Sequence, residues 1–245
     1  MEFFLIWLGL TSIVVAIARS TGRSPVFDAW PAYLFALPLA LRIASVVRTL
    51  SNPASFSLHD AALLLQQLTT IAFFGLLVVL FAARRRVSGP HATRTQGVVA
   101  LVGTFSLNLV GFLPAESSAS TTSLLASSAV VIVGTLFAIW SLAILGRCFG
   151  IFPEVRGLVL RGPYRLVRHP VYLGEIVAGL GILLTRPHLL TLALLVVFIA
   201  FQYWRTVFEE RALATAFPSE YPAYRVRVPR LFPLLAPARR QFMGA

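Results

Sequence analysis

The stretch LLASSAVVIVGTLFAIWSLAIL, from Leu124 to Leu145, contains no charged residue and decides the class of fold. A helix needs roughly 20 mostly apolar residues to cross the hydrocarbon core of a bilayer, and this stretch supplies them. Of the 245 residues in the chain, 58% are hydrophobic and only 12% are charged, and the mean hydropathy is +0.82. Water-soluble domains of this length do not normally have such a composition. The sequence therefore predicts an integral membrane protein.

Further apolar runs on both sides of this stretch are also predicted to be membrane helices. The first run has no basic residue before it, so we interpret it as a span and not as a cleavable signal peptide. The last two runs are joined by only three residues, which predicts a helical hairpin, and both are short for a full crossing. The additional predicted spans are Phe3–Ala18, Ala29–Val47, Leu58–Ala83, Gly97–Leu113, Val171–Thr185 and Leu189 to about Tyr203. We expect an all-α polytopic membrane bundle of about seven helices.

The 21 basic residues are all Arg, and their distribution predicts which loops face the cytoplasm. Short cytoplasmic loops carry an excess of positive charge. With the N-terminus outside, eighteen Arg fall in cytoplasmic segments, Arg48 and Arg186 fall on the opposite side, and Arg42 lies within a span. We therefore expect the Arg-rich segments to face the cytoplasm. The net charge is +12, and the basic residues that produce it lie between the apolar runs instead of forming one basic surface. This distribution argues against nucleic acid as a partner and favours membrane lipid.

The chain is predicted to fold as one bundle made of two parts. A change in composition near residues 84–96 divides an N-terminal three-helix part, residues 1–96, from a C-terminal part, residues 97–245, which holds nearly all the motifs. No repeat and no long linker separates them. The single Cys148 excludes an internal disulfide, and the four His are scattered, so we expect no metal site. Nothing in the sequence indicates the oligomeric state.

The segment LGRCFGIFPEVRGLVLRGPYRLVRHPVY, Leu145–Tyr172, lies between two predicted spans and is broken by Gly and Pro. Proline fixes its own φ and pushes the preceding residue toward extended geometry, so His169-Pro170 marks a turn before a helix. Tyr164 and Arg168 lie near that helix start, whose free N–H groups and dipole favour an anionic group. The segment fits either a cofactor cradle or an Arg-rich interfacial loop anchored by Tyr.

A second group of polar residues follows the last predicted span. Arg205 and Glu209 are four residues apart and can pair across one helical turn. The adjacent carboxylates of Glu209 and Glu210 could bind a cationic amine or ribose hydroxyls, or they could form an ordinary solvated helix end. The aromatic and Pro-rich tail beyond them could lie on the bilayer surface or fold back over a pocket.

Taken together, these motifs resemble the isoprenylcysteine carboxyl methyltransferases and their bacterial relatives, including phospholipid methyltransferase-like proteins. The resemblance covers about Ser141 to Pro233, and its order and spacing match throughout. It implies a membrane methyltransferase that uses S-adenosyl-L-methionine, with Arg205 in a catalytic role toward the methyl acceptor. The motifs that carry it are Leu158-Val159, Gly162-Pro163-Tyr164, Arg168-His169-Pro170, Tyr172, Gly174 and, some 35 residues later, Glu209-Glu210.

The physical character of these residues agrees with the cofactor that the resemblance implies. Aromatic rings stabilise a sulfonium cation face-on, and a carboxylate suits the amino group or ribose of the cofactor. Arg168 and the helix start could receive the cofactor carboxylate. The predicted cofactor-binding residues are Leu158, Val159, Tyr164, Arg168, His169, Pro170, Tyr172, Glu209 and Glu210.

Two departures leave the methyl acceptor open. Arg156 stands where the isoprenylcysteine enzymes often carry a His, and the first three predicted helices match no motif. An isoprenylated protein, a small thiol, a lipid amine or a lipophilic carboxylate would all fit an intramembrane pocket. One alternative is an NADPH-dependent membrane reductase of sterol-reductase-like architecture, although a 2′-phosphate would prefer Arg to the acidic pair. Another is a non-catalytic membrane sensor or assembly protein that retains the fold.

Overall fold

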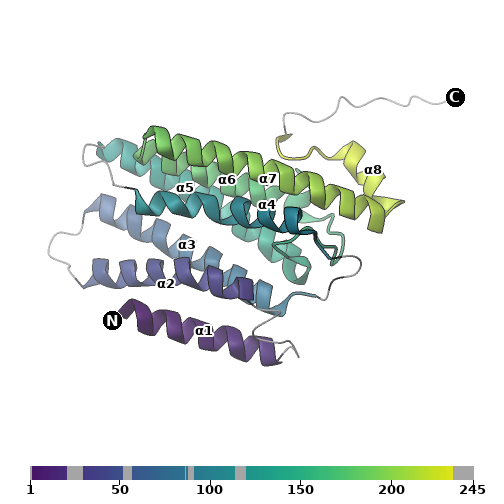
Figure 1. Cartoon of the computed structure of the whole chain (residues 1–245). Helices are drawn as coiled ribbons and strands as arrows, with labels where there is room; N and C mark the ends of the chain where they lie inside the picture. The colour runs from purple at the N-terminus through teal and green to yellow at the C-terminus, as the bar shows by residue number, and fades with distance from the viewer. Residues whose placement is uncertain are drawn as a thin grey trace.

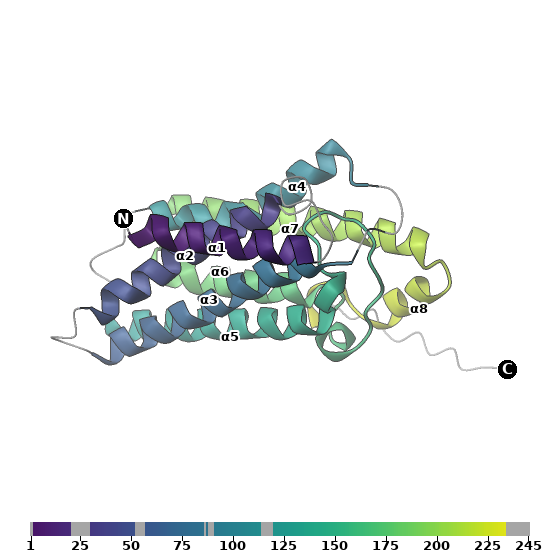
Figure 2. The same ribbon diagram turned by 90° about the horizontal axis from the view of Figure 1, so that it is seen from below.

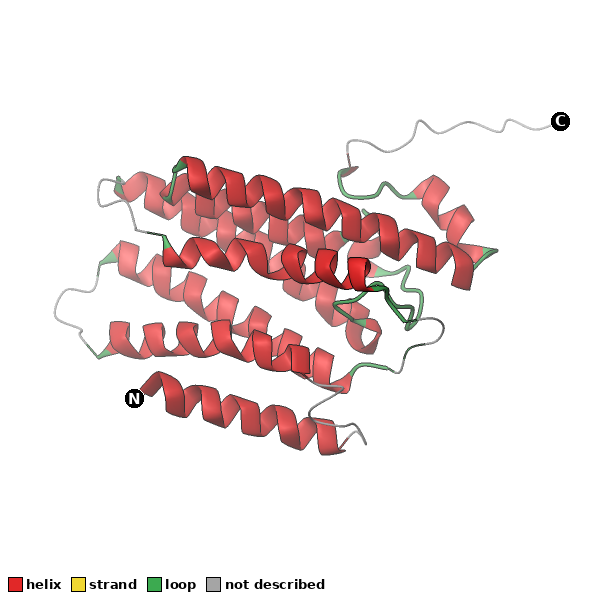
Figure 3. Ribbon diagram, viewed as in Figure 1, coloured by secondary structure: helices red, strands yellow, loops and turns green. Residues whose placement is uncertain are grey.

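The computed structural model describes residues 2–20, 30–51, 57–85, 87, 91–113 and 120–233. Within these ranges the chain forms helices, turns and loops and contains no β-strand (Figure 3). This confirms the predicted all-α fold. The α-helices are α1 (Glu2–Ser20), α2 (Trp30–Leu50), α3 (Leu58–Ala83), α4 (Arg94–Phe105), α5 (Thr121–Leu145), α6 (Pro170–Thr185), α7 (Leu189–Ala216) and α8 (Glu220–Arg227), and the 3-10 helices are η2 (Ser106–Phe112), η3 (Gly146–Cys148) and η4 (Gly162–Arg165).

The helices from α1 to α7 run in alternating directions along the chain and form one bundle (Figures 1 and 2). As a result α3, α5 and α7 all finish at the end of the bundle where α8 lies (Figure 1). We call this the Arg-rich end, because it holds Arg84, Arg85, Arg147, Arg168 and Arg230. The helices therefore alternate as the Arg distribution requires, and the side of the membrane that this end faces stays a prediction.

Four of the described helices are long and apolar enough to cross a membrane. They contain the segments Ala32–Leu50, Asp60–Ala83, Thr121–Cys148 and Leu189–Ala216. The described part of α1 and the whole of α6 are apolar but shorter. The protein is thus an integral membrane protein, whereas the predicted total of about seven spans, and the depth reached by the α6–α7 hairpin, stay predictions.

Local sequence explains where several helices begin and end. Ser57 and Asp60 form a capping box at the start of α3, in which each side chain accepts a hydrogen bond from the other's backbone N–H. Gly146 ends α5 with a φ of 55°, a left-handed conformation that favours glycine. Pro170 is the first residue of α6, where the N–H that proline lacks would have no partner within the helix.

The predicted span Gly97–Leu113 is realised in two pieces, α4 and the 3-10 helix η2. A side chain from the α6–α7 turn donates hydrogen bonds to carbonyl groups at the end of this 3-10 helix. Arg186 Nη1 donates hydrogen bonds to the carbonyl oxygens of Val110, at 2.9 Å, and Leu113. The α6–α7 hairpin is therefore fastened to η2 at the end of the bundle opposite the Arg-rich end.

Helices α5 and α6 approach so closely that glycine is needed at their contact. A Cβ atom on Gly134 would lie 2.5 Å from the backbone nitrogen of Ala178 and 2.6 Å from the carbonyl oxygen of Gly174. Small residues allow membrane helices to bring their backbones together. Ser127 Oγ also donates a hydrogen bond to the Gly181 carbonyl oxygen, at 2.7 Å. This contact fixes the start of α6 beside the loop that leaves α5.

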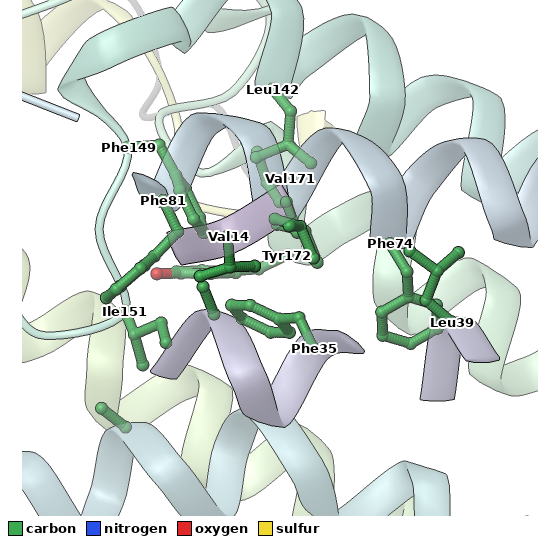
Figure 4. Packing of buried hydrophobic residues seen from close by; sticks show 14 of the residues in the cluster. Val14, Phe35, Leu39, Phe74, Phe81, Leu142, Phe149, Ile151, Val171 and Tyr172 are labelled. Carbon is green, nitrogen blue, oxygen red and sulfur yellow. The ribbon is translucent and has the colours of Figure 1, made fainter. Parts of the chain in front are cut away.

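A buried apolar cluster joins the N-terminal helices to the C-terminal ones (Figure 4). Phe35 of α2 contacts Phe81 of α3 with ring centroids 6.3 Å apart. The same cluster includes Leu142 of α5 and Tyr172 of α6. Tyr172 therefore belongs both to this core and to the polar site described next.

Candidate functional site

The α6 and α7 helices face each other through polar side chains at the Arg-rich end. The rings of His169 and Tyr172 are stacked, with centroids 5.7 Å apart and planes within 6°. The Tyr172 hydroxyl donates a hydrogen bond to Glu209 Oε1. His169 Nδ1 lies 3.6 Å from Glu209 Oε2, and His169 Nε2 lies 3.3 Å from Glu210 Oε1. The two predicted motifs, Arg168-His169-Pro170-x-Tyr172 and Glu209-Glu210, thus meet in space.

Glu210 is the centre of a buried charge cluster. Its side chain is 4% exposed, and it lies 2.7 Å from Arg168 Nη2 and 2.7 Å from Arg230 Nη2. Arg168 Nη1 also donates hydrogen bonds to the carbonyl oxygens of Arg225 and Val228. Because its guanidinium is used in these contacts, Arg168 holds the tail in place. The cofactor contacts predicted for Arg168 and Glu210 stay predictions.

The tail folds back over the site, which is one of the two arrangements expected from the sequence. The backbone N–H of Arg168 donates to the Pro229 carbonyl oxygen at 2.9 Å, and that of His169 donates to the Arg230 carbonyl oxygen at 3.1 Å. From α8, the Tyr224 hydroxyl donates to the Tyr164 carbonyl oxygen at 2.6 Å. The segment from α8 to Arg230 therefore closes one side of the site.

The opposite side is closed by the loop that follows α5. Arg85, just after α3, donates its backbone N–H to the Arg147 carbonyl oxygen at 2.7 Å, and Arg147 Nε donates to the Ala83 carbonyl oxygen at 2.9 Å. Arg156 Nε donates to the Arg85 carbonyl oxygen at 3.2 Å. The N-terminal part thus holds the loop in place, and Arg156 contributes one of the hydrogen bonds between them.

Between the tail and the loop lies an open-sided cleft that encloses about 870 Å³, counting the open solvent at its mouth. Seven of the nine predicted cofactor-binding residues line it, and Pro170 and Glu210 do not. Pro170 is buried at the first turn of α6, where it sets the direction of the helix. The seven lining residues are Leu158, Val159, Tyr164, Arg168, His169, Tyr172 and Glu209.

Several cleft residues were missed in the sequence. Phe149, Phe152 and Glu154 come from the loop after α5, and Tyr221 and Tyr224 come from α8. The only sequence signal in the loop is its mixture of apolar and charged residues, which does not reveal which side chains turn inward. Cys148 is half-buried and also lines the cleft.

Arg205, predicted to be catalytic, lies behind the cleft. Its side chain is buried, and its guanidinium is stacked 4.7 Å from the centre of the Tyr172 ring. Arg205 Nη2 donates to the Ile151 carbonyl oxygen at 2.9 Å, and Nη2 lies 3.9 Å from Glu209 Oε1. The i, i+4 pairing expected of Arg205 and Glu209 is therefore present. In this position Arg205 supports Tyr172 and Glu209, and its contact with an acceptor stays a prediction.

The charges at the mouth of the cleft shift two pKa values in opposite directions. Burial disfavours the protonated imidazole of His169, but the Glu209 and Glu210 carboxylates outweigh burial and raise its pKa. Burial also opposes ionisation of Glu154, but the Arg156 guanidinium, 2.7 Å away, outweighs burial and lowers the pKa of that carboxyl. The cleft therefore combines carboxylates with a histidine whose cationic form is favoured.

Comparison with known proteins connects this geometry to a family. Residues 122–220 match the phospholipid methyltransferase family. The chain is also 39% identical over 80 residues to the cobalt-zinc-cadmium resistance protein CzcN of Cupriavidus metallidurans. That match covers 32% of this chain and 37% of the relative, so it spans little more than a third of the length of CzcN. No solved structure matches the chain.

The family match coincides with the elements that build the cleft. It begins in α5, includes the loop and both motif helices, and ends where α8 begins. His169, Tyr172 and Glu209 all lie within it. The resemblance predicted from these motifs is thereby confirmed for residues 122–220, which match the model of the phospholipid methyltransferase family.

Proposed function

We propose that the protein is an integral membrane methyltransferase that uses S-adenosyl-L-methionine and methylates a lipophilic or small acceptor. The observation that carries this proposal is the meeting of Tyr172, His169 and Glu209 on one cleft at the end of an apolar helical bundle. This cleft lies in the part of the chain that matches a methyltransferase family. The proposal assigns the methyltransferase activity to these side chains.

The chemistry of the cleft fits this cofactor. Tyr164 offers an aromatic ring for a sulfonium cation, and Glu209, held by the Tyr172 hydroxyl, offers a carboxylate for an amino group or ribose hydroxyls. Leu158 and Val159 supply apolar surface beside them. S-adenosylmethionine would bring an activated methyl group on its sulfonium sulfur. The residues of the chain need only bind, align and desolvate the two reactants, since a one-step displacement requires no covalent nucleophile.

The two reactants are proposed to arrive by different routes. The Arg-rich end, where the cleft opens, suits the cytoplasmic face, which is where a soluble cofactor would be available. A lipophilic acceptor would reach the site from the bilayer, between helices that are themselves apolar. We accordingly place the protein in a bacterial inner membrane, with lipid as its surrounding partner.

Two alternatives receive less support. An NADPH-dependent reductase would need a cation for the 2′-phosphate, but Arg168 is already bound to Glu210. The name of CzcN concerns resistance to metal ions, and in the described ranges no three His, Cys, Asp or Glu side chains are gathered to hold a metal. We therefore extend no metal-related role to this chain.

Titration of the full chain in lipid nanodiscs, by calorimetry, tests the proposal. We expect S-adenosylmethionine to bind, NADPH not to bind, and Glu209→Gln to weaken binding by roughly 10- to 100-fold, because a hydrogen bond to a charged group contributes about 1.5–3 kcal/mol. Glu220→Gln, on the exposed face of α8, is the matched control and should bind like the parent. The proposal fails if the folded parent does not bind the cofactor, or if Glu209→Gln and His169→Ala both bind it like the parent.

Methyl transfer from tritiated S-adenosylmethionine into lipid extracts separates an enzyme from a non-catalytic relative. We expect label in a product that requires the parent protein and is lost in Glu209→Gln. Tight cofactor binding without any labelled product, across lipid, thiol and amine acceptors, would instead support a non-catalytic sensor that retains the fold.

A further inference from the structure

One acidic residue of α6 has no part in the proposed cofactor site. Glu175 is the only charged residue in the apolar helix Pro170–Thr185. It lies three residues beyond Tyr172, so it is about 4.5 Å deeper in the bundle and close to the same helix face. Charged residues in membrane helices are costly and usually mark a functional path. Glu175 therefore requires an explanation that the cofactor does not provide.

The partner of Glu175 comes from α7 and is completely buried. Gln202 is 0% exposed, and its Nε2 donates a hydrogen bond to Glu175 Oε2. Gln202 Oε1 in turn accepts a hydrogen bond from Arg205 Nη1 at 3.2 Å. The amide therefore connects Glu175 to Arg205, whose guanidinium supports Tyr172. A continuous polar path runs from the cleft into the apolar bundle.

Two polar atoms of this path have no hydrogen-bond partner among the described residues. No described residue donates a hydrogen bond to Glu175 Oε1, and the residue as a whole is half-buried. Arg205 Nε is buried and has no hydrogen-bond partner among the described residues. A purely structural ion pair would pair these groups, because unpaired buried polar groups are costly. The arrangement instead fits a site that a polar ligand group completes.

We propose that Glu175 and Gln202 form the acceptor subsite, and that Glu175 takes the proton from an acceptor whose reacting atom is an amine nitrogen or a thiol sulfur. This inference rests on the proposed function and deepens it by narrowing the acceptor. An amine or a thiol is preferred to a lipophilic carboxylate, because an ionised Glu175 would repel a second carboxylate. Glu209 and Arg205 of α7 are the charged groups whose fields act on Glu175.

The proposed step balances in atoms and charge. The acceptor nitrogen or sulfur forms a bond to the methyl carbon, and the bond from that carbon to the sulfonium sulfur breaks with its electron pair remaining on sulfur. The proton that the acceptor loses is received by a Glu175 carboxylate oxygen. Gln202 holds the other carboxylate oxygen, so the accepting oxygen is kept in a fixed direction. No oxidant, reductant or third reactant is needed.

Binding of simple amphiphiles to the full chain in zwitterionic nanodiscs tests the proposal without relying on turnover. The probes are radiolabelled dodecylamine, dodecanethiol and dodecanoate, measured as binding above empty nanodiscs, with and without S-adenosylhomocysteine. We expect the parent to bind the amine or thiol at least 10-fold more tightly than dodecanoate. Glu175→Gln keeps the size of the side chain and should remove this preference, whereas Glu220→Gln should retain it.

Turnover and cofactor affinity provide the second readout. Removing a positioned base typically costs about 10²–10⁴-fold in rate, so Glu175→Gln should lower methylation of the amine or thiol by at least about 10²-fold. Its Kd for S-adenosylmethionine should equal that of the parent, since Glu175 does not line the cleft. Equal or tighter binding of dodecanoate, absence of specific binding by all three probes, or an unchanged preference in Glu175→Gln would overturn the subsite. Loss of cofactor binding by the parent would instead overturn the proposed function.

Discussion

Within the helix pairs α2–α3 and α6–α7, the two helices pack against each other through different kinds of side chain. In the first pair, large apolar residues such as Phe35, Phe74 and Phe81 fill the contact. In the second pair, polar and charged residues face each other at the Arg-rich end, and Tyr172 and Glu209 are in direct contact. Both pairs lie in one bundle, and α6 contributes Tyr172 to the apolar cluster that α2 and α3 form.

The polar α6–α7 contact is the less favourable of the two for stability. Burying charges in a membrane bundle is expensive, and apolar packing of similar volume is often equally stable or more stable. The polar α6–α7 contact is therefore best explained by binding and chemistry. The apolar α2–α3 contact is best explained by support, because the end of α3 holds the loop that closes the cleft.

The largest expected effect comes from breaking the charge cluster of the α6–α7 pair. Glu210→Ala would leave two buried or half-buried guanidinium groups, those of Arg168 and Arg230, without their carboxylate. Removing one partner of a buried ion pair typically costs about 3–5 kcal/mol. Thermal unfolding in nanodiscs should show this loss, and Glu220→Ala, which is exposed, should change stability by less than about 0.5 kcal/mol. Equal stability of the two variants would show that the cluster is dispensable.

The next effect concerns the glycine contact that positions α6. Gly134→Ala would place a methyl group 2.5 Å from the Ala178 backbone nitrogen, so the helices must move apart. We expect a loss of about 1–3 kcal/mol in the free energy of unfolding. Gly75→Ala in α3 is the matched control, because nothing lies within 4 Å of its new methyl group. A helical Gly→Ala change without a clash should be neutral or stabilising by up to about 1 kcal/mol.

A smaller effect is expected from the pH dependence of His169. Its pKa is raised above the ordinary value of about 6.5 by Glu209 and Glu210, so the protonated ring stabilises the folded state. This contribution is fully present below the ordinary pKa and is lost as the pH rises through the raised value. The unfolding temperature of the parent should therefore fall more between pH 6 and pH 9 than that of His169→Gln. Parallel curves for the two proteins would contradict this charge assignment.

The smallest effect is expected in the N-terminal pair. Gln67 Nε2 donates to Ser45 Oγ at 3.2 Å, but Gln67 Oε1 is buried without a hydrogen-bond partner. Gln67→Leu would remove one ordinary hydrogen bond and one unsatisfied acceptor, so stability should change by no more than about 1 kcal/mol. Affinity for S-adenosylmethionine should not change. A loss of affinity would show that the N-terminal helices take a direct part in binding.

The meeting of α6 and α7 could be predicted from the sequence. A three-residue connection forces two consecutive helices to run antiparallel, so residues near His169 must lie beside residues near Glu209. The Arg distribution likewise predicted the alternating directions of the helices. Both predictions use short-range rules that do not depend on the rest of the fold.

The loop around Glu154 could not be predicted in the same way. Its path is set by hydrogen bonds to Ala83 and Arg85, more than 60 residues away in the sequence. Segments of this kind have no helical or strand periodicity, so the sequence does not show which side chains point inward. Glu175 is a different case. It was overlooked although a lone charge within an apolar run is a readable signal.

Photochemical cross-linking of tritiated S-adenosylmethionine, followed by mapping of the labelled peptides, tests the central contrast between the two helix pairs most directly. Aromatic residues at the bound cofactor should capture the label. The account predicts label in peptides from Leu145–Tyr172 and α8, and its loss in Glu209→Gln. Label confined to α2 or α3, or label that persists unchanged in Glu209→Gln, would contradict it.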